Sequence, residues 1–256
     1  MKKDPKVSII TPSFNQGQFI GTTIQSVLSQ TYSNIQYIIV DGGSTDNTME
    51  IVNKYKDKVD IIISEKDKGQ SHAINKGFKL AEGELVGWIN SDDILYSDCV
   101  KKIVDLYLEN PNGSIYYGAK LDFINDAEKV IGSRNLLIPN RDWLLNNNYD
   151  VIQPGSFYSN KILKKCEYLD EDIHYCMDLD LWLKLLKYSD IFHTNKKPLA
   201  AFRRWEQTKT ATGKTKFLND IRKTLLKHNC AKFSPNIIRI YWKVLKHFIK
   251  IIIGKK

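Results

Sequence analysis

Four short and almost wholly apolar runs, separated by stretches with helical periodicity, dominate the first hundred residues of the chain. The apolar runs cover residues 7–11, 35–40, 59–64 and 85–90. Strands of this kind are buried on both sides, as in a parallel sheet that helices cover on each face. The helical patterns cover residues 19–30, 47–56 and 71–81 and begin again after residue 97. The alternation predicts an α/β fold with a doubly wound, mostly parallel sheet flanked by helices.

The pattern becomes mixed after about residue 114. A strand is expected over residues 114–119, and helices are expected near residues 141–146 and 180–188. We interpret residues 1–212 as one compact domain, with a nucleotide-binding half at 1–113 and an acceptor-binding, catalytic half at 114–212. Residues 213–256 are expected to form a basic helical extension with an amphipathic C-terminal helix.

Charge is distributed unevenly along the chain, whose formal net charge is +9. Residues 221–256 contain ten Lys or Arg residues and no Asp or Glu. The other 28 basic residues are balanced by all 29 acidic ones, so the rest of the chain carries a net charge of −1. A neutral body argues against nucleic acid as a partner, and the basic segment needs its own explanation.

Wound as a helix, residues 237–253 separate into two faces. The basic stripe consists of Arg239, Lys243, Lys246 and Lys250. The apolar face consists of Ile238, Tyr241, Leu245, Phe248, Ile249 and Ile252. Such a helix is typical of proteins that lie on an anionic membrane surface. The alternative is packing against the enzyme's own core or against a second copy in a homo-oligomer.

Compartment and topology are indicated by three further features. The four cysteines lie far apart and form no CxxC pair, which indicates reduced thiols in the cytosol. Residues 1–6 lead directly into the first predicted strand, so no signal peptide is expected. No run of about 18 apolar residues is present, so no membrane span is expected. We therefore expect a cytoplasmic protein, peripheral on the inner face of the plasma membrane.

Each predicted strand of the first half ends in a cluster of polar residues. The clusters begin at Thr11, Asp41, Glu65 and Asn90. Ligands of open α/β sheets bind beyond the carboxyl ends of the strands. The four clusters therefore predict a single binding site at one edge of the sheet.

Two adjacent carboxylates, Asp92 and Asp93, follow the fourth strand. Leaving both ionised is costly without a cation, and oxygen ligands without nearby His or Cys favour Mg²⁺ or Mn²⁺. The alternative is a helix N-cap, because Ser91-Asp92-Asp93 precedes the apolar pair Ile94-Leu95. The motif alone does not decide between the two.

Two further aspartates are candidates for chemistry. Asp41 is followed by two glycines and could accept a hydrogen bond from the imide N–H of uracil, although an ordinary strand-to-helix turn explains the same residues. Asp178 precedes the apolar run LWLKLL and is a candidate general base. Helix capping is again the alternative, and Asp180 is also available for it.

Several enzyme classes lack their signatures here. The sequence has no GxGxxG, GxxxxGK[ST] or GxSxG motif, which argues against dinucleotide-binding dehydrogenases, P-loop ATPases and α/β-hydrolases. The five histidines show no metal-ligand spacing.

Taken in order, the motifs resemble those of the family 2 glycosyltransferases, which have a GT-A fold. The matching segments are VSIITPSFNQGQFIGTTIQSVLSQTY, IQYIIVDGGSTDNT, SEKDKGQSHAINKGFKLAEGELVGWINSDD, IQPGSFYSNKIL, MDLDLWLKL and LAAFRRWEQTKTAT. They cover roughly residues 6–212, and all six stand in the family's order.

The resemblance implies an inverting, metal-dependent enzyme that uses a nucleotide-sugar donor. It implies a donor-binding set made of Thr11, Pro12, Ser13, Asn15, Asp41, Asp67, Gln70, Asn90, Ser91 and Asp92. Asp92 and Asp93 would hold Mn²⁺ or Mg²⁺, and Asp178 would deprotonate the acceptor.

The resemblance also assigns roles on the diphosphate and acceptor side. Gln153 and Trp182 would shape the sugar and acceptor pockets, and Arg203, Arg204 or Lys209 would neutralise the departing diphosphate. The chain departs from the family pattern in three places. Asn90 replaces the usual first aspartate of the metal motif, Met177 replaces an acidic residue before the base, and the closing loop lacks a common His.

These observations predict transfer of a sugar from a UDP-sugar to a glycan or lipid-linked acceptor hydroxyl in cell-surface polysaccharide synthesis. A sugar-nucleotide nucleotidylyltransferase is one alternative, but it would normally carry a basic loop after the first strand, and TPSFNQGQ has no Lys or Arg. A non-catalytic nucleotide-sugar or glycan-binding protein is another. It predicts loss of the carboxylates, whereas Asp92, Asp93 and Asp178 are present.

Overall fold

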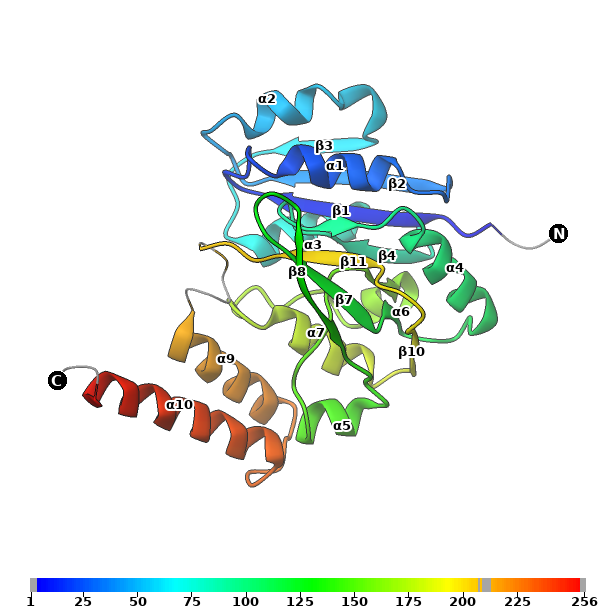
Figure 1. Ribbon diagram of the computed structural model, residues 1–256. Coiled ribbons are helices and arrows are strands. Elements are labelled where there is room, and N and C mark those ends of the chain that lie inside the picture. Colours follow the sequence, from blue (N-terminus) through cyan, green and yellow to red (C-terminus); the bar gives the residue numbers. More distant parts are fainter. Residues whose placement is uncertain (1–3, 207, 209–212, 254–256) are drawn as a thin grey trace.

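A seven-stranded sheet forms the centre of the computed structural model, which describes residues 4–206, 208 and 213–253 (Figure 1). Its strands, in spatial order, are β10 (Ile191–Thr194), β6 (Ile115–Gly118), β9 (Ser156–Ser159), β4 (Leu85–Trp88), β1 (Val7–Ser13), β2 (Ile35–Asp41) and β3 (Ile61–Ser64). Strand β9 runs antiparallel to β4 and β6, and the other neighbours pair in parallel. The prediction of a mostly parallel, helix-flanked sheet is confirmed.

The helices of the first half lie where the periodicity predicts them. They are α1 (Ile20–Leu28), α2 (Thr48–Asn53), α3 (Gln70–Leu80) and α4 (Cys99–Glu109), and a short 3₁₀ helix (Lys56–Lys58) precedes β3. Helix α3 packs closely on β1, because a Cβ atom at Gly77 would lie 2.6 Å from side-chain atoms of Ile10. Such close packing fixes the loop before α3, which carries Asp67, against the edge of the sheet.

A second sheet of four strands was not predicted from the sequence. Its order is β5 (Ile94–Leu95), β11 (Ala200–Arg203), β7 (Lys120–Ile124) and β8 (Val130–Asn135). Because Ile94 and Leu95 form a strand, and α4 begins only at Cys99, the helix-cap interpretation of Asp92 and Asp93 is wrong.

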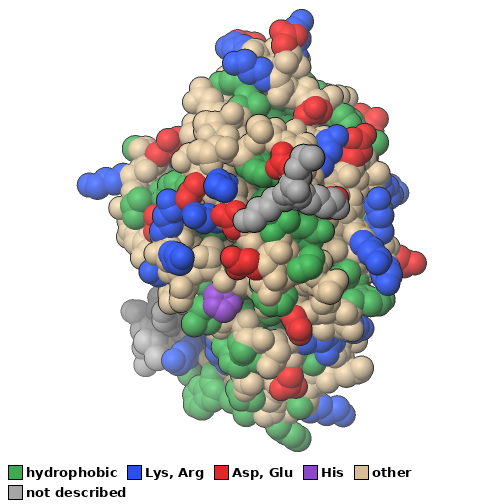
Figure 2. Space-filling model, turned by 90° about the vertical axis from the view of Figure 1, so that its right-hand side faces the viewer, with side chains coloured by type: hydrophobic (Ala, Val, Ile, Leu, Met, Phe, Trp, Pro, Cys, Tyr) green, Lys and Arg blue, Asp and Glu red, His purple; other side chains and the backbone are tan. Residues whose placement is uncertain are grey.

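Among the described residues, the second half of the domain contains three further helices. They are α5 (Arg141–Asn146), α6 (Asn160–Lys165) and α7 (Met177–Leu185). Helix α7 begins at Met177 instead of near residue 180, so Asp178 lies within its first turn. On the face drawn in Figure 2, acidic and basic side chains are interspersed, as the near-neutral charge of the body leads one to expect.

Two antiparallel helices, α9 (Lys214–Lys227) and α10 (Pro235–Ile253), follow the domain (Figure 1). Helix α9 contacts α7, and α10 contacts both α9 and α5, so the basic extension packs against the acceptor half. The predicted domain boundary after residue 212 falls outside the described residues. Within the described ranges, no helix has the length and apolar content needed to cross a membrane.

Candidate active site

The carboxyl ends of the central strands lie side by side. In the parallel register, Ser13 of β1 lies opposite Asp41 of β2, and Asp41 lies opposite Ser64 of β3. Strand β4 pairs in parallel with β1, so Asn90 emerges at the same edge. The polar clusters predicted to converge on one edge of the sheet do so.

Asp41 is fully buried, and its own turn occupies its oxygens. One oxygen, Oδ2, accepts hydrogen bonds from the backbone N–H groups of Gly43 (3.1 Å) and Ser44 (3.0 Å) and from Ser64 Oγ (2.8 Å). The other, Oδ1, accepts from the Ser44 hydroxyl. A carboxylate has about four acceptor positions. Because Oδ1 accepts only one of these bonds, one acceptor position remains on it for an imide N–H.

The β1 residues of the predicted uridine site, Thr11, Pro12 and Ser13, are all buried. Thr11 Oγ1 lies 3.0 Å from the hydroxyl of Tyr37, and Ser13 Oγ has no hydrogen-bond partner among the described residues. Asn15 has a left-handed backbone (φ 51°), and its N–H donates to Ser44 Oγ at 2.8 Å. The loops after β1 and β2 are thus bonded to each other.

Asp67 reaches the same edge because Gly42 has no side chain. A Cβ atom at Gly42 would lie 2.4 Å from Asp67 Oδ2, so a larger residue would push the loop before α3 away. Asp67 Oδ1 also accepts the N–H of Gly69 at 2.7 Å, in the turn that begins α3.

Asn90 connects three parts of the site through its amide. Its Oδ1 accepts from Gln70 Nε2 (2.8 Å), and its Nδ2 donates to Asp93 Oδ2 (3.2 Å) and Gln153 Oε1 (3.3 Å). Gln153 in turn donates to the carbonyl of Trp88 at 2.7 Å. An aspartate at position 90 could not donate either bond and would add a negative charge beside Asp93, which explains the departure from the family motif in physical terms.

Asp92 and Asp93 have different surroundings. Asp93 is fully buried, and its Oδ1 accepts the backbone N–H of Arg203 at 2.9 Å. Asp92 is half-buried, and its Oδ2 accepts from Trp205 Nε1 at 2.9 Å. Burial raises the pKa of both carboxyls, and the charge of Asp92 raises that of Asp93 further. A nearby cation would offset this cost of ionisation.

The donor set at this position suits a hard divalent ion through one carboxylate. Mg²⁺ and similar ions are commonly held by one or two carboxylates together with substrate phosphates. Asp92 has the accessible carboxylate, whereas both oxygens of Asp93 accept N–H groups, from Arg203 and Asn90. The described residues contain no cluster of three or more His, Cys, Asp or Glu side chains that could hold a metal unaided. Neighbouring Ser91 is buried, and its carbonyl accepts from Thr23 Oγ1.

The two adjacent arginines proposed for the diphosphate lie in opposite environments. Arg203 is 1% exposed, and its guanidinium donates to the carbonyls of Asp92 (2.8 Å), Asn125 (2.9 Å) and Asp126 (3.1 Å). Through these bonds, Arg203 holds together the loops that carry Asp92, Asn125 and Asp126. Arg204 is exposed, stacks on Phe123 at 3.6 Å and lines a cavity beside the site. Lys209 lies outside the described residues.

A cavity of about 560 Å³ opens beside these residues. Among its lining residues are Asn90, Gln153, Asp178, Arg204 and Trp205. Asp178 reaches it from the first turn of α7, and its Oδ1 accepts the N–H of Leu179 at 2.8 Å. One cavity is therefore faced by the Asp178 carboxylate, the amides of Asn90 and Gln153 and the Arg204 guanidinium. Its volume suits a sugar and part of its acceptor.

Trp182 lies in the core and does not line this cavity. It is fully buried, and its Nε1 donates to the hydroxyl of Tyr158 at 3.2 Å. Apolar residues beside Asp178, such as Leu179, form the wall instead.

The sequence did not single out Trp205, Tyr175, Phe217 or Ile221, all of which line the cavity. Trp205 directly follows the arginine pair, and an aromatic residue beside two arginines in a closing loop was a usable signal. Phe217 and Ile221 belong to a helix assigned to a separate extension, and no local pattern linked them to the site.

A sequence model described as "Glycosyl transferase family 2" matches residues 8–167, which is more than half of the chain. The chain belongs to this family. Curated relatives agree with the assignment. An uncharacterized glycosyltransferase of Rickettsia typhi is 30% identical over 199 residues, covering 73% of this chain and 61% of the relative. Chondroitin synthase of Escherichia coli is 27% identical over 198 residues, covering 77% of this chain and 29% of the synthase. This family 2 chain therefore spans less than two thirds of either relative.

Solved structures show the same GT-A fold as this family 2 chain. S. aureus TarS 1–349 in complex with UDP-GlcNAc aligns with a TM-score of 0.70 at 19% identity, over 93% of this chain and 72% of TarS 1–349. The mannosyltransferase PcManGT from Pyrobaculum calidifontis, in complex with GDP-Man and Mn²⁺, aligns with a TM-score of 0.61 at 15% identity, over 93% and 68%. At these identities the likeness establishes the fold.

Proposed function

We propose that this chain is an inverting transferase that moves a sugar from a UDP-sugar to a glycan or lipid-linked acceptor hydroxyl in surface polysaccharide synthesis. The observation that carries the proposal is the shared cavity, onto which the base candidate Asp178 opens together with Arg204 and with Trp205, the partner of Asp92. TarS binds UDP and UDP-GlcNAc, and chondroitin synthase is a polysaccharide-forming relative, which supports this choice of donor and product.

The donor's uridine would lie across the strand ends, on the loops that carry Asn15, Asp41 and Asp67. The remaining acceptor position of Asp41 Oδ1 would take the imide N–H of the base, while Oδ2 holds the loop after β2 through Gly43, Ser44 and Ser64. Ser13 Oγ is buried and has no hydrogen-bond partner among the described residues, so it is available to form a hydrogen bond with the nucleotide sugar.

Asp92 would hold Mn²⁺ or Mg²⁺, and Asp93 would fix the Asp92 loop through the backbone of Arg203. A bound ion would stabilise the negative charge that develops on the leaving diphosphate. The Mn²⁺ bound by PcManGT supports such an ion. Arg204 would neutralise the same charge, since it is the exposed arginine of the pair and lines the cavity.

In the reaction, Asp178 would take the proton of the acceptor hydroxyl. The hydroxyl oxygen then attacks the anomeric carbon from the face opposite the UDP group, the bond to UDP breaks, and the configuration inverts. A positioned base contributes about 10²–10⁴-fold to the rate. The remainder would come from orientation of the donor and from charge stabilisation.

Helix α10 supports a peripheral membrane location. It packs on the protein through buried residues such as Ile237 and Ile240. A neighbouring apolar stripe stays exposed: Ile238, Tyr241, Trp242, Leu245, Phe248 and Ile249, each between 42% and 59%. Lys243 and Lys246 are exposed beside it. The predicted basic stripe is partly used in packing, because Arg239 donates to Asn148 Oδ1 and Lys243 donates to the Tyr149 hydroxyl, both at 2.9 Å. The exposed apolar stripe and Lys246 remain for a membrane surface, where each Lys would add about 1 kcal/mol.

The membrane proposal is tested by sedimentation with phosphatidylglycerol vesicles. Leu245→Glu with Phe248→Glu should abolish sedimentation, whereas Leu80→Glu, a 40% exposed leucine on α3, should not. Binding should also weaken as salt rises. A wild-type chain that forms dimers and never sediments would assign the stripe to a second copy instead.

The catalytic proposal is tested by a screen of UDP- and GDP-sugars for binding and slow hydrolysis, with and without Mn²⁺. Release of UDP and free sugar is the expected result. Release of UTP and sugar 1-phosphate when pyrophosphate is added would identify a nucleotidylyltransferase, and tight binding of a nucleotide sugar without any turnover would identify a binding protein.

A further inference from the structure

Helix α9 forms one wall of the catalytic cavity, although it lies beyond the part of the chain that the family model matches. Phe217 and Ile221 of α9 line the same cavity as Asp178. The rings of Phe217 and Tyr175 meet edge to face, with centroids 6.0 Å apart. The C-terminal extension therefore adjoins the proposed chemistry directly.

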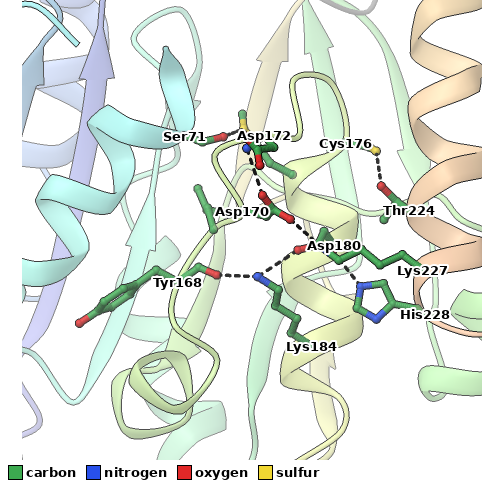
Figure 3. A network of polar contacts seen from close by, with 12 residues as sticks. Ser71, Tyr168, Asp170, Asp172, Cys176, Asp180, Lys184, Thr224, Lys227 and His228 are labelled. Carbon is green, nitrogen blue, oxygen red and sulfur yellow. Dashed lines mark hydrogen bonds and ion pairs between the residues drawn. The ribbon is translucent and has the colours of Figure 1, made fainter. Parts of the chain in front are cut away.

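The last turn of α9 is bonded to the catalytic helix α7 (Figure 3). Asp180 of α7 is fully buried, and its Oδ1 lies 2.8 Å from His228 Nε2 and 3.0 Å from Lys227 Nζ. Lys184, one turn further along α7, places its Nζ 3.1 Å from Asp180 Oδ2. Lys227 also pairs with Asp170 at 2.6 Å, so one lysine of α9 joins α7 to the loop that precedes it.

A second bond joins the two helices on the other side of the base. Cys176, which caps α7, places its Sγ 3.2 Å from Thr224 Oγ1 of α9. Cys176 and Asp180 stand two residues before and two residues after Asp178. Contacts from α9 therefore fix the first turn of α7 on both sides of the base candidate.

The charges around Asp180 indicate that this cluster fixes how α7 and α9 are arranged. Burial would raise the pKa of the Asp180 carboxyl, but the hydrogen bond from His228 and the charges of Lys184 and Lys227 lower it well below its usual range. Buried ion pairs contribute little net stability compared with apolar residues of the same volume, but they specify one arrangement of the elements that they join.

We propose that α9 is a working part of the active site and that Asp180, Lys227 and His228 are positioning residues that hold α7, and with it Asp178, in the geometry for proton transfer. The proposal rests on the proposed transferase function. It predicts that loosening the α7–α9 joint slows the chemical step without weakening donor binding, because none of the three residues lines the cavity.

The test uses the full chain with Lys227→Met, Lys227→Arg and the matched control Lys223→Met. Lys227 is 46% exposed, so its loss should not prevent folding, and Lys223 is an exposed lysine one turn earlier on the same helix. The readouts are kcat and KM for hydrolysis of the nucleotide sugar turned over fastest in the screen above, and amide hydrogen exchange across residues 177–185.

Lys227→Met should lower kcat by about 10- to 100-fold at unchanged KM, since small misplacements of a catalytic group cost rates of this order. It should also speed amide exchange in α7. Lys227→Arg should retain most of the activity, and Lys223→Met should match wild type. Adding Thr224→Val to Lys227→Met should slow turnover further.

Faster exchange in α7 with unchanged kcat would show that the joint is only structural and would overturn the proposal. Unchanged exchange would overturn it as well. If wild type hydrolyses no nucleotide sugar, the proposed function fails instead, and the exchange data still report whether α9 holds α7.

Discussion

Arg203 and Arg204 are neighbours in the chain, but the structure predicts opposite consequences when each is replaced by methionine. Arg203→Met removes three hydrogen bonds from a buried guanidinium to the carbonyls of Asp92, Asn125 and Asp126. Hydrogen bonds made by a charged group are worth about 1.5–3 kcal/mol each. We therefore expect a loss of about 4 kcal/mol in the free energy of unfolding.

For a chain of this length, 1 kcal/mol corresponds to a shift in Tm of about 2–4 °C, so Arg203→Met should lower Tm by about 8–16 °C. Arg204→Met loses mainly an exposed cation–π contact with Phe123, worth about 0.5–1 kcal/mol, and should lower Tm by less than about 4 °C. The same Arg204 variant should weaken kcat/KM for the donor.

Thermal unfolding of wild type and the two variants, followed by circular dichroism, tests whether the two arginines contribute differently to stability. If both variants lose the same stability, or if Arg203→Met unfolds within 2 °C of wild type, the assignment of Arg203 to support and Arg204 to the ligand is refuted.

Three further predictions concern the carboxylates. Asp178→Asn should reduce turnover at least about 10²-fold with donor affinity unchanged, and a mutant with wild-type turnover in steady-state assays would move the base elsewhere. EDTA should stop turnover, and Asp92→Asn should weaken Mn²⁺-dependent UDP binding in calorimetry; full activity in excess EDTA would exclude the ion. The lowered pKa of Asp180 means that its stabilising effect is complete above an ordinary Asp pKa of about 3.9 and is lost as pH falls through its folded pKa. The difference in the free energy of unfolding between wild type and Asp180→Asn, measured by denaturant titration, should therefore narrow below about pH 4. A difference that widens in acid would contradict the claim that Asp180 stabilises the fold in its ionised form.

The main sheet and its helices could be predicted because local patterns specify them. Runs such as residues 35–40 are apolar throughout, which only a strand covered on both faces accommodates. The location of the site followed from a topological rule, since parallel strands bring their carboxyl ends to one edge. Asp41 and Asn90 could thus be placed together from the sequence alone.

The features that were missed depend on contacts distant in sequence or on very short elements. Ile94 and Leu95 form only a two-residue strand, and the same letters after Ser-Asp-Asp are typical of a helix start. Adjacent residues of a strand point to opposite faces. Arg203 ends β11 and Arg204 directly follows it, so the extended chain turns one arginine inward and the other outward, but the local sequence could not say which.

The joint between Asp180 and His228 spans 48 residues, and it depends on how α9 docks. The sequence predicted an apolar helix after Asp180 and a basic helical extension, but it gave no information on the contact between them. The net basic charge of the C-terminal extension predicted a surface element, whereas its first helix, α9, packs on α7.

Inversion at the anomeric carbon is the claim from which the roles of Asp178 and the diphosphate site follow. It is tested most directly by proton NMR of the free sugar in the first minutes of hydrolysis of an α-linked UDP-sugar, before the anomers equilibrate. Water attacking with Asp178 as base should release the β-anomer first. Initial appearance of the α-anomer would contradict the proposed mechanism.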